Sequence, residues 1–199
     1  RNDGSFELGT AEGGRKIFLM GMNYLNEYKS SREALNTYYL KTIHHEFTHI
    51  LHQTVEFSTA YQFITTDYKV DKCFNREFAD FLSRGFITDY AQKNYHEDFA
   101  EMVSTYVTST ADEWEALLKK ASYAPVKDKD GNLVYDSNGL VVADTKTKAN
   151  GRDLIEQKLS IMRNYMQDQW GIDIDVLRAS ILQREQDVVN GKVDLTNVD

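Results

Sequence analysis

The sequence has one cysteine, no long apolar run and fewer basic than acidic residues, 23 against 31. Its one cysteine, Cys73, cannot form a disulfide within the chain, so we expect the fold to rest on a hydrophobic core and perhaps a metal. Apolar runs such as 17–20 are far too short to cross a bilayer. The net charge of -8 disfavours nucleic acid and anionic lipid as partners, because these need clustered Lys and Arg. We therefore expect no transmembrane segment and no nucleic-acid partner.

Proline is also nearly absent, and hydrophobic residues make up 41% of the 199 residues. A chain of this size and composition can bury a sizeable core, and no repeat or linker divides it, so we expect a single domain over 1–199. The one proline, Pro125, introduces a segment at 126–147 whose Asp-Gly and Asn-Gly pairs are typical of β-hairpin turns.

Apolar periodicity predicts helices through most of the remaining chain. A strand is expected at 15–20, and Ser30 with Glu33 has capping-box spacing before a long helix at about 31–53. Further helices are expected at 74–84 before Gly85, at 94–108, at 111–121, and in two segments separated by Gly171. The pattern predicts an α+β fold, mostly helical, with a small N-terminal sheet on the long helix and a β-hairpin excursion near 126–147.

Four of the five histidines lie within IHHEFTHILHQ, residues 43–53. His45, Glu46 and His49 form an H-E-x-x-H motif inside the expected helix. Side chains four apart share a helix face, so the two imidazoles can bind one Zn2+ at about 2.0–2.1 Å. Glu46 can then act as general base toward a metal-activated water.

The two faces of this helix differ in chemistry. Histidines 45, 49 and 52 fall on one side, and the apolar residues 43, 47, 50 and 51 fall nearly opposite. We expect the apolar face to anchor the helix. The alternative is that the histidines form only a solvated polar face. His44 and His52 are expected to be neighbours of the site rather than ligands.

A third ligand must come from farther along the chain, because the metzincin continuation fails: His52 stands in place of its glycine and Val55 in place of its histidine. The segment YHEDFAE, 95–101, places Glu97 and Glu101 four apart. One carboxylate can bind zinc while the other accepts an N–H from a ligand histidine. The alternative for Glu97 is a capping role opposite Asn94.

HEFTH followed after 47 residues by EDFAE resembles the gluzincin metallopeptidases, and the E-x-F-A-E form is similar to the anthrax lethal factor type of site. The resemblance implies a zincin-like fold with His45, His49 and Glu97 as zinc ligands, Glu46 as general base, and Glu101 behind a ligand. It also implies that Tyr90 donates its hydroxyl to the oxyanion. Tyr95 is the rival for that role, and core packing is the alternative for either tyrosine.

From about 15 to 108 the chain also resembles the zinc metallohydrolase lipoproteins of Bacteroidetes that accompany outer-membrane nutrient import. That resemblance implies export, an outer-membrane lipid anchor facing the periplasm or the cell surface, and a possible import complex as partner. No anchoring cysteine precedes the motif, and the chain opens at Arg1, so we expect a mature or truncated product.

The function expected is zinc-dependent hydrolysis of peptide bonds in a peptide or protein substrate. One alternative is a non-catalytic import accessory or binding lipoprotein, whose zinc would be closed by a fourth ligand such as His52 or His96. The other alternative is a hydrolase of glycopeptides or of non-peptide amides.

Overall fold

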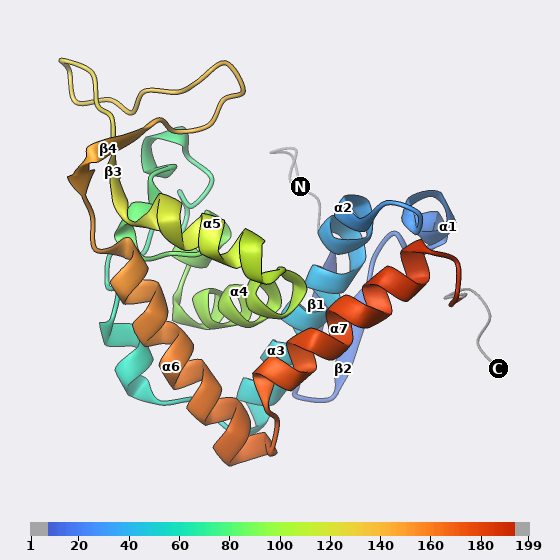
Figure 1. Cartoon of the computed structure of the whole chain (residues 1–199). Helices are drawn as coiled ribbons and strands as arrows, with labels where there is room; N and C mark the ends of the chain where they lie inside the picture. The colour runs from blue at the N-terminus through green and yellow to red at the C-terminus, as the bar shows by residue number, and fades with distance from the viewer. Residues whose placement is uncertain (1–7, 194–199) are drawn as a thin grey trace. The chain divides into compact units, whose positions relative to one another are not determined.

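The computed structural model describes residues 8–193 and is mostly helical, with two small antiparallel sheets (Figure 1). The α+β fold class is thereby confirmed. The contacts of these residues form two compact units, one made of 8–56, 103–109 and 166–193, the other of 57–102 and 110–165. Each unit is described by itself, and the single domain expected over 1–199 stays a prediction. No helix within 8–193 is long and apolar enough to span a membrane.

The first unit begins with an antiparallel hairpin of β1 (Gly9–Glu12) and β2 (Lys16–Leu19). Gly13 and Gly14 make its turn with φ of 57° and 64°, a region that glycine enters without steric cost. Both strands pack against α3 (Lys41–Thr54). The prediction of an N-terminal strand lying on the histidine helix is confirmed.

The long helix expected at about 31–53 is helical throughout but not uniform. It consists of α2 (Arg32–Leu35), a π-helical segment η2 (Asn36–Leu40) and α3. The expected cap was one residue off, because the Ser31 side chain, not that of Ser30, accepts the Ala34 N–H at 3.2 Å. A π segment inside an α-helix is often found near functional sites, and this one ends about one helical turn before His45.

The remaining helices of this unit are η1 (Met22–Tyr24), α1 (Leu25–Tyr28) and α7 (Ile174–Val189), which Asp173 caps as expected. Helix α7 contacts α2, where the Arg32 guanidinium pairs with the buried Glu185 carboxylate at 3.2 Å. A small apolar core holds these elements together: Leu25, Leu35, Tyr39 and Val188.

The second unit contains four 3₁₀ turns, η3 (Thr59–Phe63), η4 (Arg76–Phe78), η5 (Phe81–Arg84) and η6 (Tyr90–Gln92). The α-helix expected at 74–84 is therefore wrong, although Gly85 does end the segment with φ of 85°. In this segment, side chains form hydrogen bonds with backbone N–H and C=O groups that would bond to each other in an α-helix. Asn75 accepts the Glu77 N–H, and Arg84 donates to the Phe78 carbonyl.

The helices and hairpin predicted after residue 94 are confirmed with small shifts. Helix α4 (Tyr95–Thr108) starts where Asn94 accepts backbone N–H bonds, and a complete capping box starts α5 (Ala111–Ala121). Strands β3 (Tyr123–Pro125) and β4 (Ala143–Lys148) pair at the base of the excursion, and α6 (Gly151–Trp170) follows. Helix α4 is divided by the unit boundary after residue 102, and α6 after residue 165.

A buried ion pair supports the first turn of α4. Lys158 donates to the Asp98 carboxylate at 2.6 Å, and both side chains are fully buried. Lys158 also donates to the Gly85 carbonyl at 2.7 Å, and Tyr68 donates to Asp98 at 3.2 Å. Because Asp98 adjoins Glu97, this network fixes the part of the helix that carries the predicted ligand.

Candidate metal centre

Both faces of α3 are partly buried, so the expectation that its apolar face anchors the helix is borne out only in part. On the polar face His45, Glu46 and His52 are 8%, 7% and 7% exposed. On the apolar face Leu51 is 5% exposed, but Phe47 is 45% exposed. The hairpin contributes to the burial of the polar face, since Gly9 of β1 lies directly against Glu46. Burial of this face contradicts the alternative of a solvated polar surface, because buried imidazoles and carboxylates need specific partners.

The two histidines of the motif point their Nε2 atoms at each other, 3.0 Å apart. Two nitrogens bound to one tetrahedral zinc at about 2.05 Å would be about 3.3 Å apart. The observed separation is thus within a few tenths of an ångström of what a shared ion requires. Neutral imidazoles can hydrogen-bond here only if one Nε2 carries the proton, whereas a shared cation accepts both lone pairs.

The other histidines of the stretch differ in position. His52 lies next along the same face, and its Nε2 is 2.7 Å from Nδ1 of His49. His44 is outside this group, and burial lowers its pKa to about 4, so its imidazole is neutral at pH 7.

In the second unit, Glu97 shares a hydrogen-bonding group with Tyr90 and Lys93. The Tyr90 hydroxyl donates to Oε1 of Glu97 at 3.1 Å, and the Lys93 ammonium lies 3.1 Å from the same oxygen and 2.9 Å from the hydroxyl. Burial and the Glu97 charge raise the pKa of Tyr90, although Lys93 opposes them. Lys93 is partly desolvated, which lowers its pKa, but its bonds to Tyr90 and Glu97 raise the pKa above the usual value.

Sequence reasoning missed Lys93. The signal was present, since Lys93 stands four residues before Glu97 and three after Tyr90, spacings at which side chains on one helical turn meet. The capping role considered for Glu97 is supported in part: its backbone N–H donates to the Asn94 side chain at 3.0 Å, while its carboxylate accepts from Tyr90 and Lys93.

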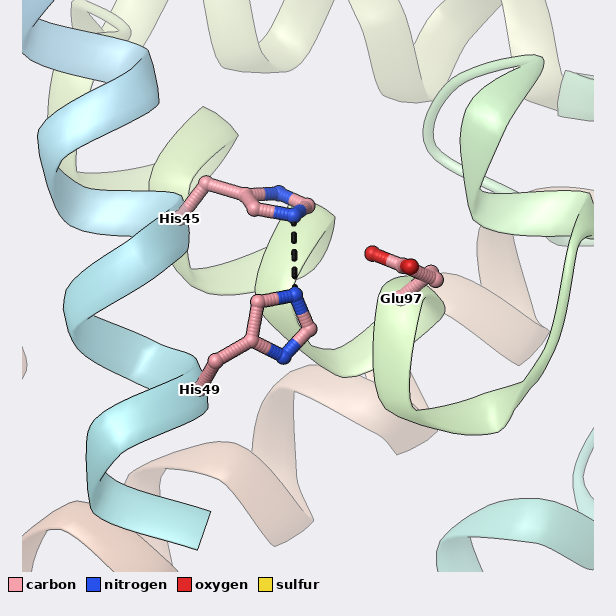
Figure 2. Close-up of side chains that lie close together, drawn as sticks. All are labelled: His45, His49 and Glu97. Carbon is pink, nitrogen blue, oxygen red and sulfur yellow. Dashed lines mark hydrogen bonds between the residues drawn. The ribbon is translucent and has the colours of Figure 1, made fainter. Parts of the chain in front are cut away.

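His45, His49 and Glu97 each offer one ligand atom, and these atoms all lie within 4.8 Å of one another. Figure 2 shows the two imidazoles one above the other along α3 and labels Glu97 as the third residue of this group. Two imidazoles and a carboxylate are a donor set that suits zinc. His52, Glu56 and His96 form a second group with the same spread of ligand atoms.

The structure also describes the contacts of the remaining predicted residues. Glu101 is buried and accepts a hydrogen bond from the Thr88 hydroxyl at 2.8 Å, so its expected bond to a ligand histidine stays a prediction. The Tyr95 ring lies 4.1 Å from that of His96, whereas the Tyr90 hydroxyl donates to Glu97, the predicted ligand. The oxyanion role of either tyrosine stays a prediction.

Comparison with known proteins identifies a family and a similar crystal structure. A family model described as "Putative zinc-binding metallo-peptidase" matches residues 1–175. A crystal structure titled as a putative zinc-binding metallo-peptidase from Bacteroides caccae is 31% identical with a TM-score of 0.71, and the match covers 100% of this chain. The chain spans 65% of the length of that protein. No curated protein matches the chain.

Proposed function

Because the chain belongs to the zinc-binding metallo-peptidase family whose model it matches, we propose that it is a zinc-dependent hydrolase of peptide bonds, of the gluzincin type. The observation that carries the proposal is the gathering of the His45, His49 and Glu97 ligand atoms within 4.8 Å, next to the buried Glu46. Two histidines and a glutamate leave a coordination position open, as catalytic zinc sites do.

The chain's own residues divide the work as follows. His45, His49 and Glu97 would hold the ion, which when bound would act as a Lewis acid toward the scissile carbonyl and lower the pKa of a nearby water. Glu46 takes the proton from the attacking water and later delivers it to the leaving amine. Its burial against β1 limits the competition of bulk solvent for that carboxylate.

Tyr90 is the proposed donor to the oxyanion. Its ring stacks on Phe74 with centroids 5.7 Å apart, which limits the positions of the hydroxyl. Lys93 donates to that hydroxyl, so the phenolic proton is directed away from the ammonium and toward an acceptor. In the structure that acceptor is Glu97, and in the reaction it is the oxygen that gains negative charge.

The rival of a non-catalytic zinc protein needs a fourth protein ligand. His52 and His96 were the candidates, and both belong to the second group of possible ligands, together with Glu56. Because that grouping separates them from His45, His49 and Glu97, it favours the open catalytic site.

The proposal is tested by incubating the zinc-loaded protein with a library of unmodified peptides and identifying the products by mass spectrometry. We expect cleavage by the native protein and none by Glu46→Gln, which keeps the shape of the side chain but cannot accept the proton. If the protein cleaves glycopeptides but not unmodified peptides, the result favours the alternative of a glycopeptide hydrolase. If neither substrate is cleaved by protein that holds one zinc, the accessory function replaces the proposal.

We extend the proposal to location by resemblance: export to the outer membrane on a lipid anchor, in the company of a nutrient-import complex. Fractionation of cells that make the full-length protein tests this extension. Recovery of the protein in the cytoplasmic fraction contradicts it.

A further inference from the structure

His49 is the middle ring of three that follow one face of α3. Its Nε2 lies 3.0 Å from Nε2 of His45, and its Nδ1 lies 2.7 Å from Nε2 of His52. The two nitrogens of His49 therefore face different partners. One faces the proposed metal position, and the other faces a histidine one turn farther along the helix.

The contact with His52 is compatible with either neutral form of His49, and a metal at Nε2 of His49 leaves only one of them. A neutral imidazole carries one N–H, and only the nitrogen without the proton can bind a metal. If the proton is on Nδ1, His49 donates it to His52 and presents the Nε2 lone pair to the ion. If the proton is on Nε2, His49 cannot use that nitrogen as a ligand. The 2.7 Å contact fits the first form with His52 accepting through Nε2, and this is the form that a metal at Nε2 of His49 requires.

The position of His52 makes it suited to this task. It follows His49 by three residues, so its ring lies over the same turn of α3, and the ring is only 7% exposed. Burial keeps water from competing for the Nδ1 proton of His49. A metal-bound histidine usually donates a hydrogen bond from its other ring N–H to a carboxylate or a carbonyl. A histidine in this place fixes the ring without adding a negative charge.

We propose that His52 is a positioning residue that accepts the Nδ1–H of His49, and so fixes the tautomer and ring orientation in which His49 binds zinc. The inference deepens the proposed function and rests on it, since it requires that His49 is a zinc ligand. It does not require hydrolysis. A zinc-binding chain that cleaves no peptide leaves it intact.

Zinc affinity, measured by competition with a chromogenic chelator, tests the proposal. We expect His52→Leu to weaken zinc binding about 10–100-fold, the usual effect of losing a partner behind a ligand. His52→Gln offers an amide oxygen as acceptor and should restore most of the affinity. The matched control is His44→Leu, which removes a histidine from the same helix outside the ligand group and should leave the affinity unchanged.

Two outcomes of this experiment overturn the proposal: a His52→Leu affinity equal to the native value, or a His52→Gln affinity as weak as that of His52→Leu. Melting temperatures measured with a chelator present show whether a variant is folded before metal is added. If the native chain binds no zinc, this proposal and the proposed function both fall. If zinc binds but peptides survive, only the proposed function falls.

The tautomer of His49 can also be determined by NMR on the native protein, without any substitution. In long-range 1H–15N spectra of the native zinc-loaded protein, we expect the His49 signals of a ring protonated at Nδ1 and metal-bound at Nε2. The opposite assignment, with the proton on Nε2, contradicts the proposal.

Discussion

Gly9 of β1 lies against the side chain of Glu46 on α3. A Cβ atom at position 9 would come 2.8 Å from Cγ of Glu46 and 2.9 Å from Cγ2 of Thr42, closer than side chains normally approach. The hairpin thus packs against the side chain of Glu46, the proposed general base. This close packing is possible because residue 9 is a glycine and has no side chain.

The first prediction follows from that contact. Gly9→Ala should displace the Glu46 carboxylate and lower kcat for peptide cleavage by up to about 100-fold, since small misplacements of a catalytic group have effects of that size. Zinc content, measured in parallel, should stay at the native level, because position 9 lies against Glu46 rather than a proposed ligand. Thr10→Ala, on the opposite face of the strand, is the control. Native kcat in Gly9→Ala would show that the packing does not matter.

The second prediction concerns the tyrosine beside Glu97. If Tyr90 donates to the oxyanion, Tyr90→Phe should lower kcat by about 100-fold or more while the protein retains zinc. Tyr38→Phe, at an exposed position in the first unit, is the matched control. Steady-state kinetics decide the matter, since an unchanged kcat in Tyr90→Phe assigns the residue to packing and to the support of Glu97.

The third prediction concerns the buried pair of Asp98 and Lys158. Lys158→Met leaves the carboxylate buried without its cation, so the free energy of unfolding should fall by about 3–5 kcal/mol. Adding Asp98→Asn should restore much of the loss. Urea unfolding in the presence of a chelator measures both, with the exposed Lys119→Met as control. A single variant as stable as the native protein would rule out this account of the pair.

The fourth prediction concerns pH and the hairpin turn at Asp128. Backbone N–H bonds from Asn132 and Asp130, together with the Asn132 amide, lower the pKa of the Asp128 carboxyl. Since the folded pKa is below the unfolded value of about 3.9, this stabilisation is complete above that value and is lost as the pH falls through the folded pKa.

Titration of the carboxyl carbons by NMR measures that shift. Unfolding free energies of Asp128→Ala should converge with those of the native protein as the pH is lowered. The control is Asp130→Ala, which removes a carboxylate from the same turn but keeps the backbone bond to Asp128. A pKa of Asp128 at or above the ordinary aspartate value contradicts the prediction.

Local signals in the sequence predict most of the helices because each depends on neighbouring residues. The cap at Asn94, the capping box at Thr110 and the glycine turns of the hairpin all bond within a few residues, and the structure contains each of them. The prediction failed at 74–84, where the aromatic stripe matched a helix. There the Arg84 guanidinium bonds to the Phe78 carbonyl and the Asn75 side chain accepts the Glu77 N–H, and the aromatic stripe gives no sign of these side-chain bonds.

The site shows the same limit. Spacing alone pairs His45 with His49, and the Nε2 contact agrees with that pairing. Spacing could not indicate that the polar face of α3 is also buried, because that depends on where the β1–β2 hairpin packs. Lys93 was overlooked because a lysine beside a glutamate at helical spacing is usually a surface pair, and only its second bond, to Tyr90, sets this one apart.

The most direct test of the central claim is the zinc content of protein purified without added metal, measured by plasma mass spectrometry and again after reconstitution. The account predicts one zinc per chain in the native protein and in Glu46→Gln, and loss of that zinc in Glu97→Ala. A native chain that holds no zinc after reconstitution would contradict the ligand set and, with it, the proposed hydrolase.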